Sequence, residues 1–136
     1  MPTEFEDQSV SSVLKFAHIV FDRLSFKRLG FQNVKAESTD FAIGKQVQKT
    51  GDGQYQVTVS VKATRSEEYE IEISITGYCE IDENAPFKDK ILEENAVAIL
   101  FPYIRAELSL LTAQPETEVL TIPAVNINAM FRSQNQ

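Results

Sequence analysis

Two strictly alternating apolar runs, separated by a short polar turn, constrain the fold of this chain more than any other feature. Residues 55–63 carry apolar side chains at every odd position, and residues 69–75 repeat the pattern. Such alternation gives a β-strand one apolar face and one polar face. Because the segment from Arg65 to Glu68 is short and polar, the two runs are predicted to form an antiparallel hairpin.

Two more strands are expected upstream of this hairpin. Residues 41–48 alternate, and the turn Thr50-Gly51-Asp52-Gly53 leads into the next run. Residues 13–27 carry apolar side chains at most even positions, but also Ala17, Ile19 and Phe21 at odd ones. This pattern predicts a strand that is apolar on both faces, with a helix as the alternative. The four runs together predict a four-stranded antiparallel meander.

The hydrophobic period changes after the fourth run. From Lys88 to Ala113 apolar residues recur at spacings of three and four, which is typical of a long amphipathic helix. Pro102 lies inside this segment, so a kink or a break is expected there. An apolar loop follows, and Asn126 is suited to cap a short last helix. The predicted fold class is α+β: a four-stranded antiparallel sheet, a long proline-containing helix, an apolar loop and a short C-terminal helix.

Length and charge limit the organisation and the partners of the chain. Its 136 residues suit one domain over 1–136, with an N-terminal tail at 1–12 and a C-terminal tail at 132–136. The net charge of −7 argues against sequence-independent binding to nucleic acid or to anionic lipid. Since no apolar run approaches the ~20 residues of a membrane span and no signal peptide is evident, we expect a cytoplasmic protein.

Few residues are available for catalysis or for metal binding. The chain has one histidine, one cysteine and no tryptophan. His18 has no second histidine or nearby cysteine with which to build a zinc site, and Cys79 is expected to be a buried, inert thiol. The acidic stretch from Glu80 to Glu83 lacks the ligand spacing of a calcium loop. We therefore predict no enzymatic activity, no metal and no cofactor.

The excess of apolar residues is more informative about function. A single long helix covers one face of a sheet, which leaves the apolar residues on the other face of residues 13–27 and those after Glu118 without an obvious cover. Exposed apolar patches mark surfaces for partners or ligands. Oligomerisation through the sheet and a groove for extended apolar peptide both remain open at this point.

Two motifs in the C-terminal third resemble signatures of the SecB protein-export chaperone family. Residues 99–107, Ile-Leu-Phe-Pro-Tyr-Ile-Arg-Ala-Glu, resemble the helix signature Leu-Phe-Pro-Tyr-Ala-Arg-Glu, in which the proline also lies within a helix. Residues 122–131, Ile-Pro-Ala-Val-Asn-Ile-Asn-Ala-Met-Phe, resemble the second signature of the family. The resemblance spans roughly residues 14–131. It implies an ATP-independent holdase that binds unfolded preproteins for export and assembles as a homotetramer, a dimer of dimers.

The resemblance also implies which residues contact partners. Client-binding residues are expected on the sheet, the apolar loop and the last helix: Phe41, Ile43, Leu120, Ile122, Val125, Ile127, Met130 and Phe131. The family docks the SecA motor through acidic residues, and Glu72 aligns with one such position. Arg23 and Lys27 stand where the first strand of the family carries carboxylates, and cations there reverse the attraction for a basic partner.

Two alternatives to export remain open. A SecB-like chaperone dedicated to an antitoxin of a toxin–antitoxin system has the same fold and differs only in its client. A small-molecule binding protein that uses the cleft between sheet and helix belongs to a different functional class. Neither alternative involves nucleic acid or direct insertion into a membrane.

Overall fold

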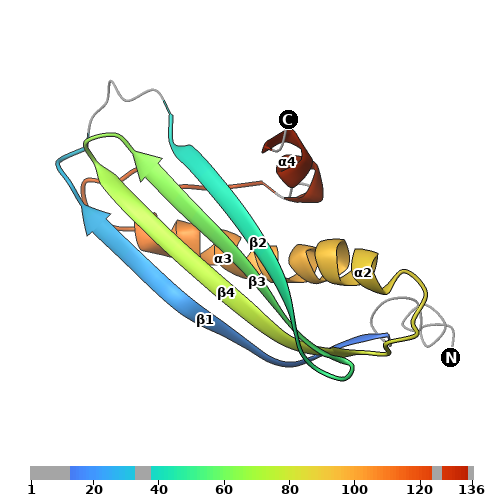
Figure 1. Ribbon diagram of the computed structural model, residues 1–136. Coiled ribbons are helices and arrows are strands. Elements are labelled where there is room, and N and C mark those ends of the chain that lie inside the picture. Colours follow the sequence, from blue (N-terminus) through green and yellow to red (C-terminus); the bar gives the residue numbers. More distant parts are fainter. Residues whose placement is uncertain (1–12, 33–37, 124–126, 135–136) are drawn as a thin grey trace, which may run out of the picture.

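The computed structural model describes residues 13–32, 38–123 and 127–134 of the chain (Figure 1). One antiparallel sheet contains the four strands β1 (Leu14–Arg28), β2 (Asp40–Gly51), β3 (Gln54–Arg65) and β4 (Tyr69–Ile81). The helical part consists of α2 (Lys88–Lys90), the π-helical turn η1 (Ile91–Asn95), α3 (Ala96–Thr112) and α4 (Ile127–Gln134). The predicted α+β class is confirmed. The last helix takes in residues 132–134, so it extends into the segment expected to be a C-terminal tail.

The strand order is β1-β4-β3-β2, so the predicted meander is correct for β2, β3 and β4 but wrong for β1. Strand β1 pairs with β4 along its length, from Leu14 opposite Ile81 to Arg28 opposite Tyr69. The reason lies in the connections. Short turns join β2 to β3 and β3 to β4, whereas residues 29–39 separate β1 from β2 and are enough to reach the opposite edge of the sheet.

Two register shifts explain the apolar pattern of β1. They fall between Phe16 and His18 and between Phe21 and Arg23, so that Ala17 and Asp22 are extra residues. Each extra residue reverses the parity of the side chains that follow it. The prediction of a strand apolar on both faces is therefore wrong for Ile19 and Phe21, which share one face with Phe16, Leu24 and Phe26 and stand opposite buried residues of β4. Val20 is on the other face, opposite Thr76, and is exposed.

The hydrophobic core lies between α3 and the central strands β3 and β4 (Figure 1). Leu100, Ile104 and Leu108 of α3 are completely buried, and each such side chain stabilises the fold by about 1.5–3 kcal/mol. Of the kink or break predicted at Pro102, the break does not occur, because α3 continues through this residue. Pro102 and Ala98 both lie on the exposed side of α3, where water can satisfy the carbonyl of Ala98 that loses its N–H partner.

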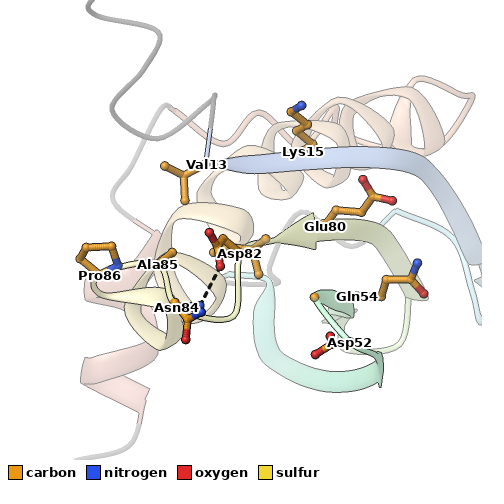
Figure 2. Close-up of a pocket in the computed structure, with 11 residues that line it drawn as sticks. Val13, Lys15, Asp52, Gln54, Glu80, Asp82, Asn84, Ala85 and Pro86 are labelled. Carbon is orange, nitrogen blue, oxygen red and sulfur yellow. Dashed lines mark hydrogen bonds between the residues drawn. The ribbon is translucent and has the colours of Figure 1, made fainter.

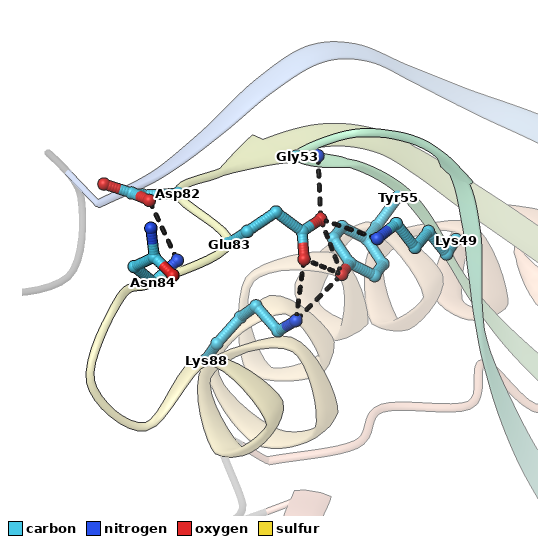
Figure 3. Close-up of polar contacts among 7 residues, drawn as sticks. All are labelled: Lys49, Gly53, Tyr55, Asp82, Glu83, Asn84 and Lys88. Carbon is cyan, nitrogen blue, oxygen red and sulfur yellow. Dashed lines mark hydrogen bonds and ion pairs between the residues drawn. The ribbon is translucent and has the colours of Figure 1, made fainter.

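A polar cluster ties the start of the helical part to the β2–β3 hairpin (Figure 3). The Glu83 carboxylate accepts hydrogen bonds from the Gly53 amide (2.7 Å), the Tyr55 hydroxyl (2.9 Å) and Lys88 Nζ (3.0 Å), and Lys49 Nζ lies 3.3 Å away. These donors, Lys88 first, lower the pKa of Glu83 to about 2. The hydrogen bonds to Tyr55 and Glu83 raise the pKa of Lys88. The cluster thereby fixes where the helix begins relative to the sheet.

Candidate functional site

An apolar cavity of about 260 Å³ lies where β2, α3, the loop after α3 and α4 meet. Its lining is apolar except for one threonine side chain, and it draws on residues far apart in the sequence. The lining residues are Phe41, Ile43, Val61, Phe101, Leu108, Leu120, Thr121, Ile122, Pro123 and Met130. Phe41 is 38% exposed at this site, so the apolar surface is accessible from solvent.

A second hollow of about 410 Å³ adjoins the first. The two share Phe41, Ile43 and Met130, and the second adds Ala129 and Ser133 of α4. Figure 1 shows α4 beside β2, at the edge of the sheet that is remote from β1. The accessible apolar surface thus continues from the cavity along β2 towards α4.

The structure brings together five of the eight predicted client-binding residues. These are Phe41, Ile43, Leu120, Ile122 and Met130. Ile127 and Phe131 are instead buried in the core, at 2% and 5% exposure, and anchor α4 to the rest of the domain. Val125 lies outside the described residues.

The sequence analysis missed the cavity residues that α3 contributes. Phe101 and Leu108 are seven residues apart, which places them on one face of a helix. Both are almost fully buried, at 4% and 0% exposure, while they form the floor of the cavity. The heptad spacing was the available signal, but it does not distinguish the floor of a cavity from an ordinary core.

Polar contacts hold α4 against η1 and β2. The Lys45 ammonium lies 5.0 Å from the centre of the Phe131 ring and donates a hydrogen bond to the Glu93 carbonyl (3.0 Å). The Asn128 amide donates to the Glu94 carbonyl at 3.1 Å. These contacts hold α4 in place, with Met130 at the border of the cavity.

The predicted motor-docking residues lie on the face of the sheet opposite α3. The Arg23 guanidinium forms an ion pair with Glu72, and Lys27 stands opposite Glu70 in the β1–β4 register. The Arg23 cation therefore compensates the carboxylate of Glu72 on the neighbouring strand. Glu72 does not present the uncompensated negative charge that would attract a basic partner.

Another hollow, of about 600 Å³, lies at the β2–β3 hairpin end of the domain (Figure 2). Its lining mixes the carboxylates of Asp52, Glu80 and Asp82 with Lys15 and a few small apolar side chains. Asp82 is already engaged, since it accepts a hydrogen bond from the backbone amide of Asn84 (2.9 Å). The charged lining makes this hollow less suited to apolar polypeptide than the cavity beside β2.

His18 packs against an aromatic ring, and Cys79 lies in the core. The rings of His18 and Tyr78 meet edge to face, with 6.5 Å between their centroids. Cys79 is buried, and burial raises its pKa to about 11, so the thiol stays protonated near neutral pH.

Among the described residues, no group of three or more His, Cys, Asp or Glu side chains is arranged to hold a metal ion. No helix in the described part of the chain is long and apolar enough to cross a membrane.

Comparison with known proteins identifies the class of this domain. The family described as preprotein translocase subunit SecB matches residues 9–136. The chain belongs to the SecB family, whose members are chaperones.

Two individual proteins are informative neighbours. An uncharacterised protein of Methanocaldococcus jannaschii, MJ0357, is 36% identical over 62 residues, which is 45% of this chain and only 40% of that relative. The SecB-like chaperone Rv1957 of Mycobacterium tuberculosis was solved in complex with a ChAD peptide from the HigA1 antitoxin. It superimposes with a TM-score of 0.67 at 12% identity, over 92% of this chain and all of that one. At this identity the likeness establishes the shared fold.

Proposed function

We propose that this protein is an ATP-independent chaperone that holds unfolded polypeptides in the cavity between β2, α3, the loop and α4. The observation that carries the proposal is the accessible apolar surface at this site, with Phe41 38% exposed beside a cavity of about 260 Å³. Unfolded chains expose apolar side chains that native proteins bury, so an apolar site selects unfolded clients. Such binding requires no nucleotide and no covalent chemistry.

The size and composition of the site favour polypeptide over a small metabolite. Pockets for drug-sized ligands span roughly 300–1,000 Å³ and carry several placed polar groups. The cavity beside β2 is smaller, and Thr121 is the polar side chain in its lining. It suits individual apolar side chains of a longer polypeptide, and the adjoining hollow along β2 extends the surface for the residues that follow. Met130 and Phe41 can adapt to side chains of different shapes.

An antitoxin is the second candidate client. The Mycobacterium tuberculosis chaperone with the same fold was solved with an antitoxin peptide. In this chain Arg23 compensates the charge of Glu72, the residue aligned with an acidic motor-docking position. These observations favour a dedicated client, while the apolar cavity serves either role. We also propose that the protein is a cytoplasmic homotetramer of single-domain chains, a proposal that membership of the SecB family supports.

The test is capture of a preprotein diluted from denaturant, compared with the same preprotein in its native form, without ATP. We expect complexes with the unfolded form alone, measured by size-exclusion chromatography with light scattering. A parallel experiment uses a peptide from the C-terminal region of an antitoxin. Capture of the peptide but of no unfolded preprotein supports the dedicated role. Failure to capture either one refutes the proposed function.

A further inference from the structure

Both backbone polar groups of Leu120 are hydrogen-bonded by hydroxyls near the end of α3. The Ser109 hydroxyl donates to the Leu120 carbonyl at 2.8 Å. The Leu120 amide donates to Thr112 Oγ1, also at 2.8 Å. We refer to these two hydrogen bonds as the Leu120 clip.

The orientation of the Thr112 hydroxyl is fixed. Thr112 is completely buried, and its hydroxyl donates to the Leu108 carbonyl at 2.7 Å, the usual bond of a helical threonine. With its proton directed along the helix, the oxygen is free to accept from the Leu120 amide. Ser109 instead directs its hydroxyl out of the helix towards the loop. Thus two hydroxyls three residues apart act as one acceptor and one donor for a single loop residue.

The clip lies at the wall of the candidate site. Leu120, Thr121 and Ile122 all line the cavity, and the chain there is neither helix nor strand. Thr121 and Ile122 directly follow the clipped residue, so fixing the backbone of Leu120 also restricts where these two side chains lie. The clip therefore determines which loop side chains form the wall.

A separate anchor holds the beginning of the loop. Arg28 donates to the Pro115 and Glu116 carbonyls, at 3.4 and 3.2 Å, and also bonds the Thr117 hydroxyl. None of these three loop residues lines the cavity. The arginine thus fixes the exit from α3, whereas the clip fixes the part of the loop that faces a client.

We propose that Ser109 and Thr112 are positioning residues of the client-binding site. This inference rests on the proposed function, because it assigns them to the affinity for unfolded polypeptide. A wall that is ordered before binding avoids the entropic cost of ordering it when a client arrives. Since one hydrogen bond is typically worth about 1 kcal/mol, loss of either bond is expected to weaken client binding about five-fold.

Two pairs of variants test this role. Ser109→Ala and Thr112→Val each remove a hydroxyl, while Ser109→Thr and Thr112→Ser retain it. The dissociation constant for an unfolded preprotein is measured without nucleotide, at a temperature where circular dichroism shows every variant folded. We expect about five-fold weaker binding in the first pair and less than two-fold change in the second.

Hydrogen exchange supplies a readout that separates the two bonds. The Leu120 amide is expected to exchange faster in Thr112→Val, which loses its acceptor, and to stay protected in Ser109→Ala. If Thr112→Val does not fold, the half-buried Ser109 carries the test through Ser109→Ala and Ser109→Thr.

The outcomes distinguish this inference from the proposed function. Failure of the unmodified chain to capture unfolded preprotein or antitoxin peptide overturns the proposed function and this inference with it. Capture by the unmodified chain with unchanged affinity in Ser109→Ala overturns the inference alone. Equal weakening in the alanine variant and in Ser109→Thr also overturns it, because the shape of the side chain and not its hydroxyl would then be responsible.

Discussion

Replacing Phe41 by alanine should weaken client binding by an amount that follows from its exposure. A phenylalanine presents roughly 200 Å² of accessible surface, so the 38% that remains exposed offers about 75 Å² to a client. At about 25 cal/mol per Å² this surface contributes about 2 kcal/mol when covered. We therefore expect the dissociation constant of Phe41→Ala for an unfolded polypeptide to rise roughly 30-fold.

The matched control is Phe87→Ala. Phe87 is 78% exposed in the loop before α2 and lines neither of the hollows beside β2. Both variants are titrated against a labelled, unfolded preprotein without nucleotide, and their melting temperatures are recorded. If binding depended only on exposed apolar area, Phe87→Ala would lose more affinity than Phe41→Ala. That order, or an unchanged dissociation constant for Phe41→Ala, would refute the placement of the site.

Three further predictions concern other parts of the molecule. Met130→Asp places a carboxylate in the apolar cavity, so capture of unfolded preprotein should be lost while circular dichroism shows a retained fold; an unfolded variant would mean that Met130 belongs to the core. The lowered pKa of Glu83, about 2 against an ordinary 4.5, adds stability that is present above about pH 4.5 and is lost as the pH falls towards 2. In Glu83→Gln the melting temperature should therefore depend less on pH between 4.5 and 2 than in the unmodified chain. An equal pH dependence in both proteins would contradict a stabilising role for Glu83. Arg23→Asp leaves Glu72 unpaired and makes the outer face more acidic, so calorimetry should show tighter binding of the SecA motor; unchanged binding would mean that this face is not used.

The core-facing side chains of β3 and β4 were predictable from the sequence, because their alternation is regular. Those of β1 were not, because two bulges interrupt its alternation. Over residues 55–63 of β3 and 69–75 of β4 the alternation is unbroken, and each apolar residue of these runs is buried as predicted. In β1 the core-facing residues switch from even to odd positions after Ala17 and back to even positions after Asp22. The sequence analysis assumed one uninterrupted alternation and therefore assigned apolar residues to both faces. Two changes of parity within one strand are the signature of two bulges, and the sequence contains this signal.

The candidate site was predictable as a region but not side chain by side chain. Ile127, Met130 and Phe131 follow the i, i+3, i+4 spacing of one helical stripe, and nothing in that spacing separates them. The structure divides the stripe, because Ile127 and Phe131 enter the core while Met130 borders the cavity. Only the placement of α4 against η1 and β2 decides this division, and the contacts that set it join residues more than 30 positions apart in the chain.

Hydrogen bonds help to hold the loop and α4 beside the cavity, whereas apolar packing holds the other elements of the domain together. A loop held down by its own leucine and isoleucine side chains would have them buried against the helix and unavailable to a client. Here the backbone of Leu120 is fixed by the hydroxyls of Ser109 and Thr112, so its side chain and that of Ile122 can line an accessible cavity. Likewise Lys45 and Asn128 help to hold α4, which leaves Met130 at the site. A chaperone that binds apolar segments must keep apolar side chains ordered but uncovered, and hydrogen bonds to the backbone beside them achieve both conditions.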